Sequence, residues 1–336
     1  MSEHFINVDE ARRTCVEALG NAGVPLEHAR VQVDLLMEAQ LRGRASHGLL
    51  RLPRIVERVR RGIADPITRG ELCWRGNSLL HVNGRQGLGP VIAFHALEQI
   101  TLRAKETGVA VASIEQCNHL GMIALYAERV AAQGQILIAM TTSEALVHPW
   151  GGRTAMIGTN PVAIGVPAAP HPFVLDMATS LISMGQVHDY AHRGTPLETG
   201  WALDANGDPT LDATAAKQGS IAPFGGAKGY ALGLAFEVLV ASLTASAMGV
   251  EVKGTLDAEH PCNKGDVFIV IEPAAGGAAT QVGAYLDAIR RSPPQRADRP
   301  VLVPGDRAHR QRARSLEDGI SIAPDVWRSI RELAIS

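Results

Sequence analysis

Gly84-Arg85-Gln86-Gly87-Leu88-Gly89-Pro90 decides which kind of fold this chain can adopt. The segment lies between a predicted β-hairpin and a predicted helix that runs to about Thr107. Its glycines follow the order Gly-x-x-Gly-x-Gly, whereas the dinucleotide-binding turn of a doubly wound sheet has the order Gly-x-Gly-x-x-Gly. No acidic residue closes a following strand at the expected place. The sequence therefore predicts an α/β chain that does not have a Rossmann fold.

The elements expected around this segment mix helices and strands along the chain, an order typical of an α/β or α+β fold. The first helix is expected to begin at Val8 with Asp9 as its N-cap residue, and a second helix to begin at Pro25. Apolar runs bounded by turn residues predict strands at 71–74, 78–82, 109–114, 136–141, 162–166, 173–175 and 268–271.

The distribution of these elements suggests two domains. Helices dominate both chain ends, whereas strands and glycine-rich loops fill the middle. The simplest partition is a mostly helical domain built from residues 1–120 and 292–336, which encloses a sheet domain of residues 121–291.

Composition restricts the class of partner. The 336 residues carry a net charge of −2, and only 4% of them are aromatic, which argues against a nucleic-acid surface. The four cysteines are scattered and form no Cys-x-x-Cys pair, so the sequence predicts neither a zinc site nor a redox dithiol.

Targeting signals are also missing from the sequence pattern. The start Met1–Phe5 lacks the basic and apolar regions of a signal peptide, and we expect a cytoplasmic protein. No run reaches the roughly 18 apolar residues of a membrane span. The apolar run Tyr230–Val240 is interrupted by Gly233 and Glu237 and predicts a buried helix.

The segment Arg44-Ala45-Ser46-His47-Gly48-Leu49-Leu50-Arg51-Leu52-Pro53 carries the clearest chemical signal. His47 and Arg51 are four residues apart, so a helix would stack them on one face. Arginine can grip a carboxylate through two parallel hydrogen bonds, and histidine exchanges a proton near neutral pH. The alternative is a solvated helix face with an incidental histidine. His119 adds a second imidazole, in a loop expected after the strand 109–114.

Three further patterns could carry chemistry. Gly225–Gly229 places Lys228 and free N–H groups at the start of a long helix, which suits an anion, and Thr159, Thr179 and Ser180 could add hydroxyl donors. A hydrolase triad of Ser46, His47 and Asp176 is weak because no Gly-x-Ser-x-Gly elbow is present. The pair His188 and His192 lacks a His-Glu-x-x-His pattern, so no metal site is predicted.

Taken together, the chain resembles the malate/L-lactate dehydrogenase family that lacks a Rossmann fold. The resemblance runs from about residue 8 to residue 333. The segments that carry it are Ser46-His47-Gly48, Arg51-Leu52-Pro53, Asn118-His119, Pro149–Gly152, Gly158–Pro161, Asp176–Ser180, Gly200–Asp204 and Pro223–Gly229.

The resemblance implies a largely antiparallel sheet domain that binds NADH or NADPH, inserted in the helical domain, and a homodimer. It also implies hydride transfer between the nicotinamide and a small 2-oxo or 2-hydroxy carboxylic acid. One alternative is reduction of a cyclic imino acid of the piperideine-2-carboxylate or pyrroline-2-carboxylate type. The others are a binding protein that has lost catalysis and an acyl hydrolase.

Carried over by position, the family's roles fall on particular residues. His47 and His119 would be catalytic, with His119 expected as the proton donor and His47 orienting or sharing that role. Ser46 and Arg51 would hold the substrate carboxylate. Gln186 departs from the aspartate suspected of proton transfer in some imine reductases. The residues expected to line the cofactor are Thr159, Asn160, Pro161, Asp176, Met177, Ala178, Thr179, Ser180 and Lys228.

Overall fold

The computed structural model describes residues 5–274 and 277–336. Its helices are α1 (Val8–Asn21), α2 (Leu26–Leu41), α3 (Leu52–Arg60), α4 (Gly89–Thr107), α5 (Ala124–Ala132), α6 (Met184–Arg193), α7 (Ala213–Ala216), α8 (Gly226–Thr244), α9 (Ala279–Arg290), α10 (Asp306–Asp318) and α11 (Pro324–Ile335). Its strands are β1 (Phe5–Ile6), β2 (Glu71–Arg75), β3 (Leu79–Asn83), β4 (Val109–Glu115), β5 (Ile136–Thr141), β6 (Val162–Val166), β7 (Phe173–Met177), β8 (Ala202–Leu203), β9 (Ser220–Ile221), β10 (Asp266–Ile271) and β11 (Ile320–Ser321).

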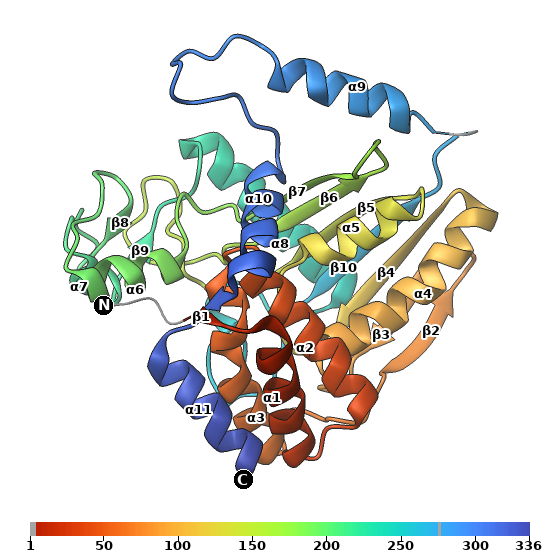
Figure 1. Cartoon of the computed structure of the whole chain (residues 1–336), viewed down its shortest axis with the longest axis horizontal. Coiled ribbons are helices and arrows are strands. Elements are labelled where there is room, and N and C mark those ends of the chain that lie inside the picture. Colours follow the sequence, from red (N-terminus) through yellow and green to blue (C-terminus); the bar gives the residue numbers. More distant parts are fainter. Residues whose placement is uncertain (1–4, 275–276) are drawn as a thin grey trace.

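A seven-stranded sheet forms the centre of the molecule, in the order β2-β3-β4-β10-β5-β6-β7 (Figure 1). Only the β3–β4 pair is parallel, and helix α4 connects those two strands. The other five neighbouring pairs are antiparallel. The predicted non-Rossmann, largely antiparallel α/β fold is therefore confirmed.

The two faces of the sheet are covered differently. Helices α4 and α5 pack on one face over a core of small and β-branched residues, and α8 packs on the other. A separate core joins α1, α2, α3 and α11, so both chain ends meet in one helical bundle (Figure 1). A small third core joins α6, α7, β8 and β9 beside the sheet.

The register of the central strands creates the edge at which the site forms. Asp266 at the start of β10 pairs with Ile114 near the end of β4 and with Thr141 at the end of β5. The loops leaving β4 and β5 and the segment entering β10 therefore converge at one place.

The predicted domain boundary at residue 120 divides this sheet. Strands β2, β3 and β4 precede that boundary, whereas β5, β6, β7 and β10 follow it. A single sheet therefore contains strands from both predicted domains. The partition into residues 1–120 with 292–336 and residues 121–291 stays a prediction.

Two local predictions are wrong. The N-cap of α1 is Asn7, whose side-chain oxygen accepts hydrogen bonds from the N–H groups of Asp9 and Glu10. The apolar run Tyr230–Val240 lies in α8, and this helix is not buried: its outward face exposes Leu232, Leu234, Val238, Leu239 and Leu243. We call these five residues the α8 face.

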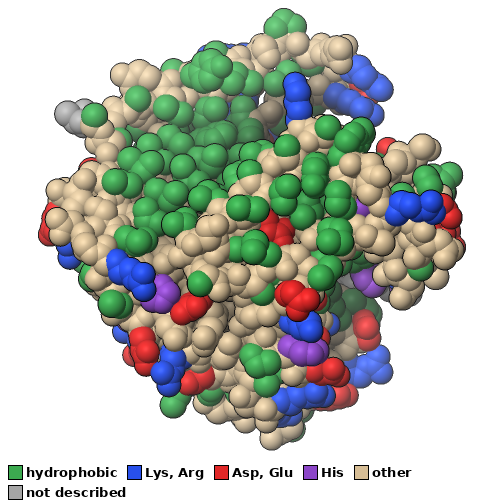
Figure 2. All heavy atoms as spheres, turned by 180° about the vertical axis from the view of Figure 1, so that it is seen from behind, with side chains coloured by type: hydrophobic (Ala, Val, Ile, Leu, Met, Phe, Trp, Pro, Cys, Tyr) green, Lys and Arg blue, Asp and Glu red, His purple; other side chains and the backbone are tan. Residues whose placement is uncertain are grey.

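Among the helices of the described residues, α8 alone is long and apolar enough to cross a membrane, judged by length and composition. It nevertheless packs against β4, β5 and β10 of the sheet. In Figure 2 a broad apolar area covers one face of the molecule. An apolar helix with one side on a sheet and the other side uncovered has one surface left without a partner.

Candidate active site

His119 lies in the loop that leaves β4, at the edge where three strands converge. The glycines of the 84–90 segment make room for this loop. A Cβ atom at Gly89 would lie 2.2 Å from the carbonyl oxygen of His119, and one at Gly84 would lie 2.8 Å from that of Gln116. The segment therefore allows close backbone packing.

His47 and Arg51 come from the opposite side, where the chain leaves α2. The chain forms two 3-10 turns here, Ala45–His47 and Leu49–Arg51, which lead into α3, and not the single helix that would stack the two side chains. The imidazole rings of His47 and His119 lie with their centroids 5.5 Å apart, at a tilt of 43°. The structure thus brings together residues that are 72 positions apart in the chain.

The Arg51 guanidinium is held in place by backbone oxygens. Its Nε donates to the carbonyl oxygen of Ser46 at 2.7 Å, and its Nη1 donates to that of Thr255 at 3.3 Å. The remaining N–H groups, including both on Nη2, have no partner among the described residues. A buried guanidinium with fixed orientation and free donors is suited to a carboxylate.

These side chains border a cavity of about 150 Å³. Its wall combines the two histidines with residues from the ends of β5 and β10. The lining residues that matter below are Ser46, His47, Arg51, His119, Thr159, Pro161, Thr255 and Lys264.

Both histidines are neutral in this environment. Burial, followed by the charges of Arg51 and Arg44, lowers the pKa of His47 to about 4. Burial, followed by the charge of Arg51, holds the pKa of His119 well below its usual range. Burial and a neighbouring guanidinium both disfavour the positively charged imidazolium, so the neutral form of the ring predominates.

Hydrogen bonds distinguish the two rings. Nδ1 of His119 accepts the N–H of Gly121 at 2.9 Å, so the neutral ring carries its proton on Nε2. Nδ1 of His47 lies 3.0 Å from the hydroxyl of Ser46, which can donate to a neutral ring or accept from a charged one. His47 can therefore gain and lose a proton without breaking a hydrogen bond, whereas protonation of His119 at Nδ1 would break one.

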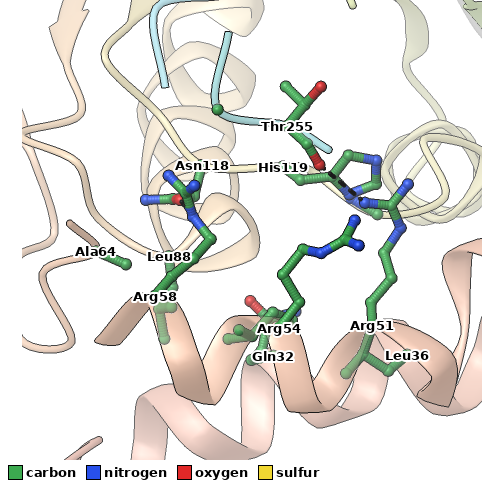
Figure 3. Close-up of a pocket in the computed structure, with 13 residues that line it drawn as sticks. Gln32, Leu36, Arg51, Arg54, Arg58, Ala64, Leu88, Asn118, His119 and Thr255 are labelled. Atoms are coloured by element: carbon green, nitrogen blue, oxygen red, sulfur yellow. Dashed lines mark hydrogen bonds between the residues drawn. The ribbon is translucent and has the colours of Figure 1, made fainter. Parts of the chain in front are cut away.

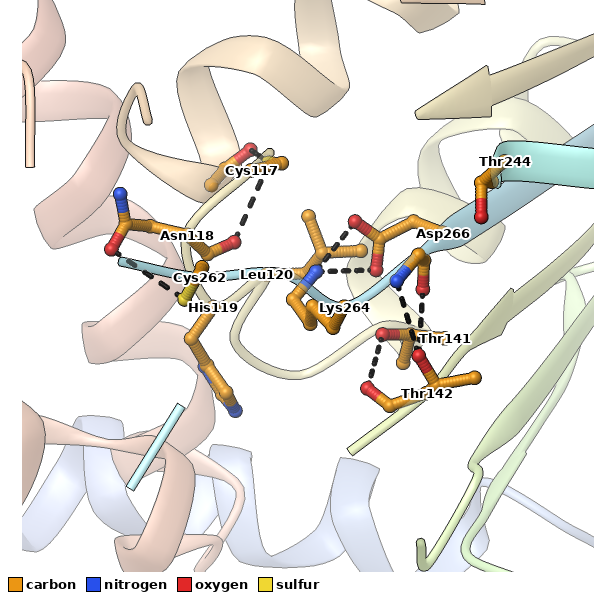
Figure 4. A network of polar contacts seen from close by, with 12 residues as sticks. Cys117, Asn118, His119, Leu120, Thr141, Thr142, Thr244, Cys262, Lys264 and Asp266 are labelled. Carbon is orange, nitrogen blue, oxygen red and sulfur yellow. Dashed lines mark hydrogen bonds and ion pairs between the residues drawn. The ribbon is translucent and has the colours of Figure 1, made fainter. Parts of the chain in front are cut away.

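Lys264 is a site residue that sequence reasoning missed. Its Nζ lies 2.6 and 2.5 Å from the two oxygens of Asp266, and both residues are almost fully buried (Figure 4). Burial has the largest single effect on the pKa of Lys264 and lowers it, but the nearby groups, led by the Asp266 carboxylate, together outweigh burial and raise this pKa overall. Lys264 is thus a fixed positive charge in the cavity wall.

A second cavity of about 210 Å³ adjoins the first and shares Ser46, His47 and Pro161 with it. Asp176, Ala178 and Ser180 line this second cavity. The hydroxyl of Ser180 is buried and has no hydrogen-bond partner among the described residues. An unpartnered polar atom facing a cavity fits a bound molecule with polar groups.

The carboxylate of Asp176 lines the same cavity and has one oxygen engaged in a hydrogen bond. One of its oxygens accepts the N–H of Ala124 at the start of α5, at 2.9 Å. Burial raises the pKa of Asp176 to about 6, against the opposing effect of that hydrogen bond. The residues of this cavity fit a nicotinamide cofactor, which carries an amide and ribose hydroxyls.

The remaining cofactor predictions fall in different places. Thr159 lines the first cavity, and its carbonyl accepts the backbone N–H and the hydroxyl of Thr179. Asn160 is buried and donates to the carbonyl of Gly233 and to the Glu237 carboxylate. Met177 packs in the core under α8.

Lys228 is exposed on the first turn of α8 and lines neither of the two cavities. Its contact with a cofactor stays a prediction, like the roles of Asn160, Met177 and Thr179.

Gln186 has a defined local role. Its backbone N–H donates to the Ser183 hydroxyl, and its side-chain oxygen accepts the N–H of Ser183, which closes a capping box at the start of α6. The residue lines the second cavity as a neutral amide.

Comparison with known proteins gives consistent matches over nearly the whole chain. The sequence profile of the malate/L-lactate dehydrogenase family matches residues 6–331. The chain is 33% identical to a malate/(S)-sulfolactate dehydrogenase of Methanothermus fervidus, over 98% of this chain and 97% of that protein. It is also 33% identical to a Δ1-pyrroline-2-carboxylate reductase of Pseudomonas fluorescens, over 99% of this chain and 100% of that protein.

Solved structures agree with these sequence matches. A crystal structure of a dehydrogenase from Sinorhizobium meliloti superimposes with a TM-score of 0.95 at 49% identity, and the match covers 99% of this chain and 98% of the other.

Proposed function

The chain belongs to the malate/L-lactate dehydrogenase family, and from that premise we propose that its two adjoining cavities transfer a hydride between a nicotinamide cofactor and C2 of a small 2-oxo or 2-hydroxy carboxylic acid. The observation that carries this proposal is the wall of the 150 Å³ cavity, where Arg51 faces a pair of histidines. Arg51 would hold the carboxylate, and its backbone contacts to Ser46 and Thr255 fix the direction in which it does so.

The cofactor would occupy the 210 Å³ cavity, near Asp176, Ala178 and Ser180, and supply the hydride. Ser180 offers a buried hydroxyl and Asp176 a carboxylate oxygen to its polar groups. NADH and NADPH both fit this description.

A carbonyl oxygen that gains negative charge during reduction needs a nearby proton source. We assign that role to His47, because the Ser46 hydroxyl supports either protonation state of its ring. His119 would act as a neutral hydrogen-bond donor through Nε2, since Gly121 occupies its Nδ1. This assignment reverses the order expected from the sequence, in which His119 was the first candidate.

Reduction of a cyclic imino acid is the second candidate, favoured by the match to the pyrroline-2-carboxylate reductase. An iminium carbon accepts hydride without protonation of an oxygen, so it makes less use of the histidine pair. Gln186, committed to capping α6, supplies no titratable group for that chemistry.

The test is the loss of near-ultraviolet absorbance of NADH and NADPH with a panel of substrates. Pyruvate, oxaloacetate and other 2-oxo acids form one arm, and piperideine-2-carboxylate and pyrroline-2-carboxylate the other. Turnover of an oxo acid that is lost in Arg51→Ala supports the proposal. Turnover of cyclic imines alone would replace it with the second candidate, and no oxidation of either cofactor would contradict both.

We also propose that the α8 face is covered by a second copy of the chain. Its exposed leucines and valine include Val238 at 48% and Leu239 at 44% exposure. A bilayer is a poorer occupant because α8 is held against three strands of the sheet. The apolar area continues beyond α8 over the same side of the molecule (Figure 2), as expected of a homodimer interface.

Sedimentation equilibrium tests this second proposal. The expected mass is about twice the 35.7 kDa of one chain, and Leu239→Glu should shift it to the monomer. Leu102→Glu is the matched control, because Leu102 is exposed on α4 across the sheet. A monomeric wild-type protein, or one that binds lipid vesicles through this face, would contradict it.

A further inference from the structure

The segment from Gly254 to Cys262 forms no helix or strand and borders the active site. Two of its residues, Thr255 and Leu256, line the 150 Å³ cavity. The carbonyl oxygen of Thr255 accepts the hydrogen bond from Nη1 of Arg51, as Figure 3 shows. The direction of the Arg51 guanidinium therefore depends on where this segment holds Thr255.

Glu144 attaches this segment to the central sheet. It lies just beyond the end of β5, and one oxygen of its carboxylate, Oε1, accepts three hydrogen bonds. The donors are the N–H of Thr255 at 2.8 Å, the hydroxyl of Thr255 at 3.1 Å and the N–H of Leu256 at 2.8 Å. Because Thr255 is only 5% exposed, water has little access to replace these bonds, and Glu144 fixes the position of Thr255.

The later part of the segment is held by a different element. Nη1 of Arg58, on α3, donates to the carbonyl oxygens of Asp257 and His260 at 2.9 and 3.0 Å. Among the described residues, Glu144 is the one acceptor for the N–H and the hydroxyl of Thr255. Loss of the Glu144 side chain would therefore release Thr255 and leave the later part attached to α3.

The charge of Glu144 matters less than its position. Burial, followed by the charge of Arg54, lowers the pKa of Arg51 to about 10, and the negative charge of Glu144 acts in the opposite direction. With a pKa near 10, the Arg51 guanidinium is already charged at neutral pH. The contribution of Glu144 is thus to place a hydrogen-bond acceptor for Arg51, not to keep Arg51 protonated.

We propose that Glu144 is a positioning residue, which directs Arg51 toward the substrate carboxylate through the carbonyl oxygen of Thr255. This rests on the function proposed above, in which Arg51 holds that carboxylate. Among the described residues, the cavity wall does not include Glu144, so its effect on the substrate passes through the segment that it holds.

Three variants of Glu144 separate position from charge in steady-state kinetics with the 2-oxo acid that wild type reduces. Glu144→Gln keeps an oxygen acceptor at the same reach and loses the charge, so kcat/KM should stay within about threefold of wild type. Glu144→Asp keeps the charge but is too short to serve all three donors, and Glu144→Ala removes the acceptor. Both should lower kcat/KM by about 10- to 100-fold, as expected for a misplaced binding group.

Two controls accompany these variants. The Kd of NADH and NADPH should stay within about twofold of wild type in each variant. Glu272→Ala should leave kcat/KM unchanged, because Glu272 is a partly buried acceptor of a hydrogen bond from Gln135 at the far end of β10. If Glu144→Ala does not fold, the comparison of Glu144→Gln with Glu144→Asp still decides the matter.

A double-mutant cycle tests whether Glu144 acts through Arg51. In Arg51→Lys the contact with Thr255 is already impaired, so adding Glu144→Ala should lower kcat/KM by less than about threefold more. A general structural role would lower kcat/KM by the same factor in both backgrounds.

A binding measurement keeps the proposal testable without turnover. Oxamate, the amide analogue of pyruvate, is titrated by calorimetry into enzyme saturated with NADH or NADPH. Its Kd should rise at least about tenfold in Glu144→Ala and in Arg51→Lys, but not in Glu144→Gln. If wild type binds oxamate in this way and reduces no 2-oxo acid, the proposed function fails while the positioning role stands.

Three results would overturn the positioning role. The first is kcat/KM and oxamate affinity in Glu144→Ala and Glu144→Asp that match wild type. The second is an equal loss in Glu144→Gln and Glu144→Ala, which would assign the effect to charge. The third is an additive double-mutant cycle. A wild-type enzyme that neither binds oxamate nor reduces a 2-oxo acid would contradict both this role and the proposed function.

Discussion

The imidazole rings of His47 and His119 face each other across 5.5 Å, and each makes a different hydrogen bond through its Nδ1 atom. One bond, from Gly121, accommodates only an unprotonated nitrogen. The other, with the Ser46 hydroxyl, tolerates both states. Two neutral histidines with separate duties beside a fixed guanidinium are the basis of the predictions that follow.

Arg51→Lys should lower kcat/KM for 2-oxo acids by at least about 30-fold, because an ammonium cannot reproduce the bidentate fork or both backbone contacts. Steady-state kinetics measures this, with Arg69→Lys as a control at an exposed ion pair to Glu98. A change of less than about threefold in Arg51→Lys would show that Arg51 does not hold the carboxylate.

Reduction should slow as the pH rises. With the pKa of His47 at about 4, the protonated form that donates to the carbonyl becomes scarcer above that value. We expect log kcat/KM for reduction to fall by about one unit per pH unit between pH 5 and 8. The reverse oxidation needs the neutral ring and should be nearly flat over that range.

In His47→Gln the slope of the reduction profile should disappear along with most of the activity. If the slope persisted in His47→Gln and disappeared in His119→Gln, the proton donor would be His119.

The same shift predicts how folding stability varies with pH. The folded-state pKa of His47, about 4, lies below the unfolded value of 6.5, so the unfolded chain binds more protons in between and stability falls as the pH drops from 6.5 toward 4. Between pH 7 and pH 5 this amounts to about 2 kcal/mol.

Asp176 acts in the opposite sense, because its folded-state pKa is raised to about 6. Its contribution to stability is present at low pH and is lost as the pH rises toward 6. Urea unfolding at pH 5 and 7 should therefore show a steeper rise of stability with pH in Asp176→Asn, whereas His47→Gln should weaken that rise or turn it into a fall. If the two variants had the opposite effects on the pH dependence of stability, His47 and Asp176 would not be buried as described above.

Lys264→Met should destabilise the protein by about 3 to 5 kcal/mol, because it leaves the Asp266 carboxylate buried without its cation. The double variant Lys264→Met with Asp266→Leu should recover most of that loss. The free energy of unfolding from urea titration measures both. A single variant as stable as wild type would mean that the pair is solvated.

Much of the fold could be predicted from local patterns. The glycine order in 84–90 excluded the Rossmann turn, and the apolar strand before Asn118 placed His119 in a loop at a strand end. These features can be predicted from sequence because the conformation of a turn and the end of a strand depend on a few neighbouring residues.

Other features depend on contacts between distant segments. Lys264 belongs to no motif and enters the cavity wall only because β10 inserts between β4 and β5. The exposed side of α8 was mistaken for core because an apolar pattern does not reveal whether a helix packs against its own chain or another.

The most direct test of the central claim is to follow the hydride itself. Reduced nicotinamide carrying deuterium at C4, prepared on each face in turn, is incubated with the enzyme and a 2-oxo acid, and the product is analysed by NMR and mass spectrometry. The proposed function predicts a 2-hydroxy acid with a single deuterium at C2 from one of the two faces. A product without deuterium from either face, or consumption of the oxo acid without oxidation of the nicotinamide, would contradict it.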